Sequence, residues 1–302
     1  MSGEAASDCD LLVLGDTGMA GAALVEAGRS RGLRARGASR RGEEPVDVAD
    51  ENALRALLER LQPRTVVNTV AIVSIPACER DPGLAWRVNA RPAALIADWA
   101  RSAGARVLHV STDHFFSGDG RALHDEGAPV VLLNDYARTK YAAEGLALTH
   151  DNTLVLRTNI LGLKSAGGGS LIEWALGAIE RDEAITLFDD QFVSSIDVWA
   201  LAEAMLDLAE APASGLLNIA SREVFSKADL IGGLAQALGR PLTRARIGSV
   251  AEQGVRRADS LGLDVSRAEA LLGRPLPTLA RVIDTLAARI SNSEVPVHAL
   301  EH

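Results

Sequence analysis

The fold is decided by the stretch Asp10-Leu11-Leu12-Val13-Leu14-Gly15-Asp16-Thr17-Gly18-Met19-Ala20-Gly21. Its apolar first half has the length of a buried strand, its glycines form a turn, and an apolar helical pattern follows to about Ser30. This order suits a dinucleotide, because glycines let the backbone approach a pyrophosphate and the helix N-terminus supplies free amide donors. The spacing is Gly-x-x-Gly-x-x-Gly instead of Gly-x-Gly-x-x-Gly, so an ordinary tight turn is the competing interpretation.

The same alternation of strands and helices continues through the first half of the chain. Since βαβ units form parallel sheets with helices on both faces, we expect an α/β fold with a Rossmann-type doubly wound parallel sheet over residues 9–160. The later pattern is less regular and predicts a smaller C-terminal α/β substrate lobe over residues 161–290, with a substrate cleft between the two. Residues 1–8 and 291–302 are expected to be tails, and 300–302 resemble an expression-tag scar. The expected strands cover 10–14, 33–38, 65–68, 106–110, 153–157 and 184–188, and the expected later helices cover 51–61, 81–102, 197–210, 227–238, 266–272 and 277–290.

The composition limits the classes of function. Hydrophobic residues make up 47% of the 302 residues, enough for a sizeable core, and a net charge of −9 argues against nucleic acid or an anionic membrane as partner. Cys9 and Cys78 fit a reducing compartment and have neither a disulfide framework nor metal-ligand spacing. No apolar run reaches membrane-spanning length and the start lacks a basic signal region, so we expect a cytoplasmic protein. No metal-binding residues are expected, and whether a metal assists stays open. A homodimer stays open.

The end of the second expected strand carries residues that would choose between cofactors. Ser39, Arg40 and Arg41 stand where a protein that prefers NAD usually has an acidic residue for the ribose hydroxyls. A hydroxyl and two guanidinium groups suit the 2′-phosphate of NADP, through charge-assisted and bidentate hydrogen bonds. A solvated basic turn is the alternative. We therefore expect NADP as the cofactor.

A tyrosine and a lysine lie four residues apart in Asn134-Asp135-Tyr136-Ala137-Arg138-Thr139-Lys140. In a helix both side chains lie on one face, and an adjacent cation stabilises a phenolate, which suits proton transfer. The chain has only 2 Tyr and three Lys. Such a pair is therefore expected by chance about 0.02 times, although an amphipathic helix that happens to carry both is the alternative.

Small and polar residues follow the third and fourth expected strands. Asn68-Thr69-Val70-Ala71 would let a flat ring and its ribose lie against the backbone, and Ser111-Thr112-Asp113 stand at the carboxyl edge where open α/β sheets bind ligands. Residues 115–133 predict a loop that forms part of a pocket wall. Asn89 suits either a core or a ligand role, whereas Trp86 and Trp99 suit a core or an interface.

In this order the glycine turn, Asn68–Ala71, Ser111-Thr112-Asp113 and Tyr136-x-x-x-Lys140 resemble the extended short-chain dehydrogenase/reductases, and within them the dTDP-4-dehydrorhamnose reductase group. The resemblance covers about residues 10–290. The Rossmann motifs are common to a very large superfamily, whereas Ser-Thr-Asp-x-x-Phe followed by the Tyr and Lys is much narrower. The resemblance is carried also by Val88-Asn89, Asp113 to Phe116 with Gly118, Asp125-Glu126, Leu156-Arg157-Thr158 and Arg257 to Ser266.

The resemblance implies NADPH-dependent reduction of the keto group of a nucleotide-linked 4-keto-6-deoxysugar. Thr112 would hydrogen-bond the sugar carbonyl, with Ser111 as second choice. Tyr136 would protonate the carbonyl oxygen, and Lys140 would hold the nicotinamide ribose and lower the pKa of Tyr136. The candidate cofactor-binding residues are Gly15, Thr17, Gly18, Met19, Gly21, Ser39, Arg40, Arg41, Asp47, Val48, Thr69, Val70, Ala71, Tyr136 and Lys140, and the candidate substrate-binding residues are Ser111, Thr112, Asp113, Asn159, Gln191 and Arg257.

Departures from the family pattern lie in the substrate half. Family members often have an aromatic residue after Arg-Thr, where this chain has Asn159-Ile160, and the Gly and Pro-Thr that often follow Asp-Gln are absent from Asp190-Gln-Phe-Val-Ser-Ser195. The sugar and the nucleotide therefore stay open. Two other functions stay open too: a sugar-nucleotide epimerase or dehydratase that regenerates a tightly bound nicotinamide, and a non-catalytic NADP-binding regulatory subunit similar to the partner of methionine adenosyltransferase.

Overall fold

The computed structural model describes residues 8–163, 169–240, 242–249 and 258–292, and the chain forms two compact units. Unit 1 consists of Met1–Ser111, Asn134–Leu156 and Ala202–Leu217, and unit 2 consists of Thr112–Leu133, Arg157–Leu201 and Asn218–His302. The sequence predicts one boundary near residue 160, whereas the units of the structure are built from discontinuous segments.

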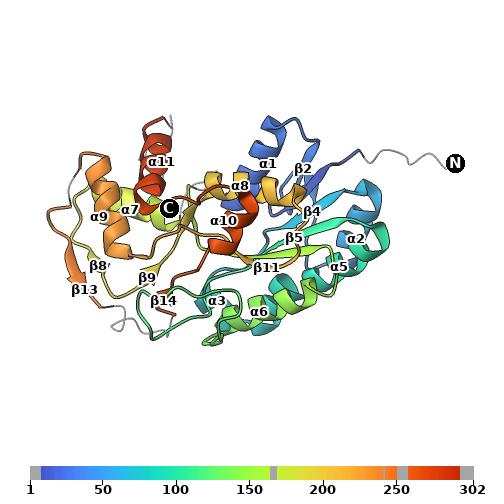
Figure 1. The fold of residues 1–302 in the computed structure, drawn as a ribbon, viewed down its shortest axis with the longest axis horizontal. Coiled ribbons are helices and arrows are strands. Elements are labelled where there is room, and N and C mark those ends of the chain that lie inside the picture. Colours follow the sequence, from blue (N-terminus) through green and yellow to red (C-terminus); the bar gives the residue numbers. More distant parts are fainter. Residues whose placement is uncertain (1–7, 164–168, 241, 250–257, 293–302) are drawn as a thin grey trace. The chain divides into compact units, whose positions relative to one another are not determined.

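Unit 1 is organised around a seven-stranded sheet with the order β11-β6-β5-β4-β1-β2-β3 (Figure 1). Every neighbouring pair from β3 to β6 is parallel. The chain runs outward from β1 in one direction and then from β4 in the other, so the switch point where such sheets bind ligands lies between β1 and β4. This confirms the doubly wound sheet. The strands are β1 (Leu11–Leu14), β2 (Ala35–Ser39), β3 (Glu44–Pro45), β4 (Thr65–Asn68), β5 (Arg106–Val110), β6 (Thr153–Arg157) and β11 (Gly215–Asn218).

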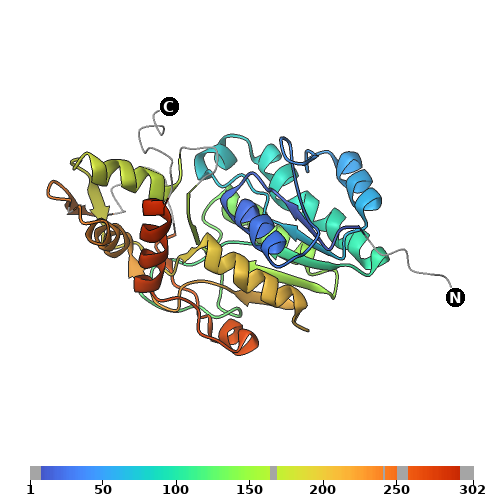
Figure 2. The same ribbon diagram turned by 90° about the horizontal axis from the view of Figure 1, so that it is seen from above.

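Helices cover both faces of this sheet (Figure 1, Figure 2). On one face lie α2 (Glu51–Leu61), α5 (Arg91–Ala103) and α6 (Asp135–Ala147), and on the other lie α1 (Met19–Ser30) and α8 (Val198–Glu210). The Asp50 carboxylate caps α2 by accepting hydrogen bonds from two backbone amides, and Gln62, with a φ of 43°, ends it in the left-handed region. The expected bounds of α2 are thus confirmed.

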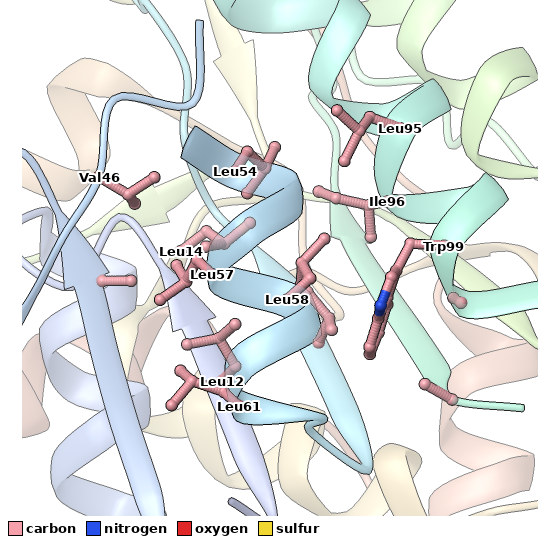
Figure 3. Close-up of a cluster of buried hydrophobic side chains, with 14 of the residues drawn as sticks. Leu12, Leu14, Val46, Leu54, Leu57, Leu58, Leu61, Leu95, Ile96 and Trp99 are labelled. Carbon is pink, nitrogen blue, oxygen red and sulfur yellow. The ribbon is translucent and has the colours of Figure 1, made fainter. Parts of the chain in front are cut away.

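The leucine face of α2 forms the main core of unit 1. Leu54, Leu58 and Leu61 repeat at helical spacing and pack against β1 and α5, where Trp99 is only 5% exposed. Figure 3 shows Leu58 and Trp99 pointing toward one another from the two helices. The prediction that Trp99 is a core residue is confirmed, whereas Trp86 is 42% exposed.

The long helix expected from residue 81 to 102 is continuous but not uniform. It consists of α4 (Pro82–Ala85), a π-helical turn η1 (Trp86–Ala90) and α5, and the short α3 (Ile75–Arg80) precedes it. Within η1, the buried Asn89 side chain accepts a hydrogen bond from the backbone amide of Ile72 at 2.7 Å and donates to the Ile72 carbonyl at 3.2 Å and to Thr139 at 3.1 Å. Asn89 therefore has a structural role that ties the segment after β4 to α6.

The chain returns to the sheet of unit 1 after most of unit 2 has been built. Arg31 at the end of α1 forms ion pairs with Glu203 and Asp207 on α8, and Arg106 in β5 donates to the carbonyl of Leu208 at 3.0 Å. Strand β11 then extends the sheet beside β6. Residues 202–217, which sequence reasoning assigned to the substrate lobe, thus complete the sheet of unit 1.

The described residues of unit 2 form a core of their own and three small sheets. Helices α7 (Leu171–Glu180), α9 (Lys227–Ala237) and α11 (Leu279–Asn292) contribute to one apolar cluster, and Ser170 and Ser226 start α7 and α9 with capping boxes. The expected loop over 115–133 is irregular, and Asn218 holds it by donating to the His124 carbonyl at 2.9 Å. The remaining elements are β7 (Ile160–Leu161), β8 (Thr186–Phe188), β9 (Phe192–Val193), β10 (Ile196–Asp197), β12 (Phe225–Ser226), β13 (Arg246–Gly248), β14 (Ser260–Leu261) and α10 (Ser266–Leu272). Across the described part of the chain, every helix is too short or too polar to cross a lipid bilayer.

The leucine face of α2 makes a quantitative prediction. Because Leu58 is fully buried, Leu58→Ala should lower the free energy of unfolding by about 2–5 kcal/mol through lost burial and the cavity left behind. Urea titration followed by circular dichroism measures this change. Leu148→Ala is the matched control, because Leu148 is 37% exposed in the same unit. Equal losses from the two variants would contradict the packing described.

Candidate active site

The glycine turn after β1 lies at the switch point of the sheet. Gly15 has a φ of 94°, and a Cβ added there would lie 2.6 Å from Thr69 Oγ1. A Cβ on Gly21 would lie 2.2 Å from the Gly15 carbonyl oxygen, so α1 packs directly on the turn. Neither position accepts a side chain without displacement. The backbone is thus held open at the place where a pyrophosphate approaches in this fold.

The first turn of α1 has the properties of an anion site. Gly18 is the N-cap residue in an extended conformation, no side chain caps the helix and no acidic residue stands in its first turn. Thr17 and Gly18 are exposed, and Met19 is half-buried. The first amides of a helix lack intrahelical acceptors and carry partial positive charge, so this end fits a diphosphate.

The segment after β4 completes this edge. The Thr69 hydroxyl donates to the Leu14 carbonyl at 2.7 Å, which joins the ends of β1 and β4. Asn68 Oδ1 accepts the Val70 amide at 3.1 Å and so shapes the turn, and Val70 and Ala71 are half-buried. The structure therefore brings the predicted residues 15–21 and 69–71 together.

The end of β2 contains an acidic group that sequence reasoning missed. Arg40 and Arg41 are exposed, and neither forms an ion pair within the described part of the chain. Beside them, the Asp16 carboxylate would lie 2.5 Å from a Cβ added to Gly37 or to Gly42, so it rests on the glycines at this strand end. Sequence reasoning found no acid here, because Asp16 precedes β2 by a whole helix. Of the other candidates, the exposed Asp47 accepts the Ala49 amide at 3.0 Å, and Val48 is buried in the core.

Tyr136 and Lys140 lie one helical turn apart on the buried side of α6, and are 8% and 2% exposed. Asn134 starts the helix by accepting the Ala137 amide at 2.9 Å. The Lys140 ammonium donates to the Val110 carbonyl, at the carboxyl end of β5, at 2.7 Å. Burial lowers the pKa of Lys140 to about 8, although the Glu144 carboxylate acts in the opposite direction. The ammonium is therefore charged near neutral pH and has a fixed position.

Two polar groups surround this lysine. Burial, and then the Lys140 charge, hold the pKa of His109 well below its usual value, so the ring is neutral and its Nδ1 accepts Asn68 Nδ2 at 3.2 Å. The Ser111 hydroxyl is buried and donates to Glu144 Oε1 at 2.6 Å. The Thr112 hydroxyl has only a longer contact, 3.5 Å from Oγ1 to Asp113 Oδ1, so its proton is less firmly engaged than that of Ser111 and Thr112 stays the first candidate for the substrate-binding hydroxyl.

Thr112 begins unit 2, next to a buried polar network. Asn159 Nδ2 donates to Asp113 Oδ2 at 2.6 Å, and the Ser195 hydroxyl donates to Asn159 Oδ1 at 2.7 Å. Burial raises the pKa of Asp113 to about 7, although the hydrogen bond from Asn159 lowers it. Asn159 stands where the family pattern often has an aromatic residue, so this network belongs to the part of the chain that departs from that pattern.

The other predicted site residues lie apart from these groups or outside the described structure. Gln191 is buried in unit 2 and donates to the Ala258 carbonyl at 3.3 Å. Arg257 lies outside the described residues. The triad of Thr112, Tyr136 and Lys140 stays a prediction, because its members belong to different units. Among the described residues, no group of three or more His, Cys, Asp or Glu side chains is arranged to hold a metal ion.

A doubly wound sheet with a glycine turn at its switch point and a Tyr-x-x-x-Lys helix beside it is the arrangement of the short-chain dehydrogenase/reductases. The family model described as RmlD substrate binding domain matches residues 9–290. The chain therefore belongs to the RmlD substrate binding domain family.

Individual relatives agree with this assignment. A dTDP-4-keto-6-deoxy-D-glucose reductase from Streptomyces niveus is 30% identical over 245 residues, which cover 78% of this chain and 81% of the relative. A probable low-salt glycan biosynthesis reductase from Haloferax volcanii is 25% identical over 93% of this chain and 98% of its own length. The structure of a dTDP-4-dehydrorhamnose reductase from Bacillus anthracis in complex with NADP superposes with a TM-score of 0.83 at 18% identity, over 92% of this chain and 97% of that one.

The network around Asp113 predicts a pH-dependent stability. Because the folded-state pKa is raised to about 7 from 3.8, the folded protein binds an extra proton between these values, and the stability contributed by Asp113 falls as pH rises through this window. Asp113→Asn removes the titration and keeps the shape. Its melting temperature relative to wild type should rise from pH 4 to pH 7 and then level off.

Differential scanning calorimetry across this pH range measures the effect. Ser195→Ala is the control, because it removes a hydrogen bond of the same network without removing a titratable group. A difference between Asp113→Asn and wild type that stays constant with pH would contradict the assignment.

Proposed function

We propose that this chain catalyses the NADPH-dependent reduction of the keto group of a nucleotide-linked 4-keto-6-deoxysugar. The observation that carries the proposal is the buried Tyr136 and Lys140 pair, with the Lys140 ammonium held at 2.7 Å by the carbonyl that ends β5. Family membership and the reductase relatives support the same reaction class. The open glycine turn and the uncapped start of α1 fit the diphosphate of the cofactor.

Reduction adds a hydride to the carbonyl carbon and a proton to its oxygen. NADPH supplies the hydride when it is bound. The residues of the chain provide the proton and the charge: the Tyr136 phenol gives its proton to the developing alkoxide, and the nearby Lys140 ammonium stabilises the phenolate that remains. Thr112 donates a hydrogen bond to the same oxygen in this proposal. Preorganised donors of this kind lower the barrier because they need no reorganisation during the reaction.

The polar network in unit 2 bears on which sugar is accepted. Asn159 and Ser195, bonded to one another and to Asp113, make this region polar where the family pattern often has an aromatic residue and a Pro-Thr pair. A polar wall of this kind suits hydroxyl-bearing positions of a sugar better than its methyl group. We therefore propose a nucleotide-linked keto sugar without assigning the rhamnose series.

We also propose a cytoplasmic location. Cys9 and Cys78 are buried, and burial raises the pKa of the Cys9 thiol to about 11. Neither cysteine is in a disulfide, which fits a reducing compartment. Sedimentation equilibrium tests the homodimer that the sequence leaves open.

The catalytic role of Tyr136 makes the first functional prediction. Tyr136→Phe keeps the ring and deletes the proton donor, so kcat for reduction of a 4-keto sugar should fall by about 10²- to 10⁴-fold with little change in NADPH affinity. Absorbance at 340 nm with dTDP-, UDP- and GDP-linked substrates measures turnover. Tyr141→Phe is the matched control on the same helix, since Tyr141 is 43% exposed, and it should keep most activity.

A Tyr136→Phe variant with normal turnover would contradict the role of Tyr136 as proton donor. Product formation by the wild-type protein without net NADPH consumption would instead identify an epimerase or dehydratase. Lys140→Ala should lose turnover and cofactor affinity together, because the ammonium is proposed to hold the nicotinamide ribose as well.

Arg40 makes a prediction about the cofactor. If its guanidinium binds the 2′-phosphate, Arg40→Ala should weaken NADPH binding by about ten- to a hundredfold and leave NADH binding almost unchanged. Isothermal titration with each cofactor measures both affinities. Arg64→Ala is the control, because Arg64 is an exposed arginine that precedes β4 at the opposite edge of the sheet. If Arg40→Ala weakened the binding of NADPH and NADH equally, Arg40 would not bind the 2′-phosphate.

A further inference from the structure

The side chain of Asp16 leaves the glycine turn toward β2 and not toward the first turn of α1. An ideal Cβ on Gly37, in β2, would lie 2.5 Å from both Cβ and Oδ2 of Asp16. A Cβ on Gly42, in the turn after β2, would lie 2.5 Å from Oδ2 and 2.6 Å from Oδ1. The carboxylate therefore rests against two positions that have room for it only because they are glycines.

Two polar atoms at this strand end lack a hydrogen-bond partner among the described residues. One is Asp16 Oδ1 and the other is the Ser39 hydroxyl, and both are buried. A buried acceptor without a donor is costly, and the cost is removed when a donor from a ligand reaches it. Asp16 Oδ1 can only accept a hydrogen bond when it is ionised, so the complementary ligand group is a hydroxyl or another donor.

In a doubly wound sheet the end of the second strand lies beside the adenosine ribose of a dinucleotide. An acid there accepts a hydrogen bond from the 2′-hydroxyl of NADH, whereas cations favour the 2′-phosphate of NADPH. Both kinds of group meet here: Asp16 from the glycine turn, and Arg40 and Arg41 from the end of β2.

We propose that Asp16 is a cofactor-selectivity residue, which accepts the 2′-hydroxyl of NADH and opposes the 2′-phosphate of NADPH. This inference rests on the proposed reductase function and deepens it. Arg40 and Arg41 are exposed, so water and salt screen their attraction, whereas the half-buried carboxylate is held in place and screened less. The two arginines favour NADPH, and Asp16 therefore reduces the difference between the affinities for NADPH and NADH.

The test compares cofactor affinities of wild type and Asp16→Asn without any sugar substrate. Loss of the negative charge should strengthen NADPH binding about tenfold and weaken NADH binding about threefold. The ratio of the two dissociation constants should therefore shift about thirtyfold. Isothermal titration at fixed ionic strength gives both constants. The NADPH gain should shrink as salt is added, because it is electrostatic.

Glu43→Gln is the matched control. It removes one negative charge from the same turn, but the Glu43 carboxylate is paired with Arg29. It should leave the ratio of affinities almost unchanged. Asp16→Ser, which is smaller and also neutral, should shift the ratio in the same direction as Asp16→Asn, and the melting temperatures of the variants without cofactor report whether they fold.

Each outcome supports or overturns a stated role. If Asp16→Asn changes both affinities by the same factor, Asp16 only shapes the turn and the inference is overturned. It is also overturned if Glu43→Gln shifts the ratio equally, since the effect would then be general electrostatics. If wild type binds neither cofactor, the proposed function itself fails, a result that does not depend on Asp16.

Discussion

The contact between Gly21 and the carbonyl of Gly15 is the constraint on which the functional edge of unit 1 depends. Helix α1 starts directly against the end of β1 only because neither residue has a side chain, and Gly15 also admits the Thr69 hydroxyl from the neighbouring strand. This close packing joins β1, β4 and α1 at the switch point. It leaves the first amides of α1 facing outward, where a diphosphate meets both hydrogen-bond donors and the positive end of the helix dipole.

The buried lysine is the second condition for function. Moving an ammonium out of water is costly, and here the Val110 carbonyl and the Glu144 carboxylate offset that cost in part. The residual effect is a lowered pKa, so that the charge is retained near neutral pH but lost at higher pH. A side chain held in this way cannot turn toward solvent, which keeps its charge beside Tyr136, one helical turn earlier. Local packing of α6 thus sets the electrostatics of the proposed proton transfer.

Much of the fold could be predicted from sequence, because β1, α2, β4 and β5 have apolar periods and turn residues that agree with one another. The placement of Asp16 could not, because its neighbours Gly37 and Gly42 become adjacent only when β2 pairs with β1. The same limit applies to residues 202–217, whose pairing with the sheet is set by tertiary contacts far apart in sequence. The position of Asn159, directly after Arg-Thr, made it a candidate from sequence. Its hydrogen bonds with Asp113 and Ser195 could not be predicted, because these residues come together only in the folded chain.

The central claim is that a hydride moves from the nicotinamide to the sugar carbonyl carbon while the chain supplies the proton. The most direct measurement incubates the protein with NADPH carrying two deuterium atoms at C4 and a dTDP-linked 4-keto-6-deoxysugar, and weighs the sugar product by mass spectrometry. One deuterium is expected at the former carbonyl carbon for each NADPH oxidised. A product without deuterium, formed while the nicotinamide stays reduced, would contradict it.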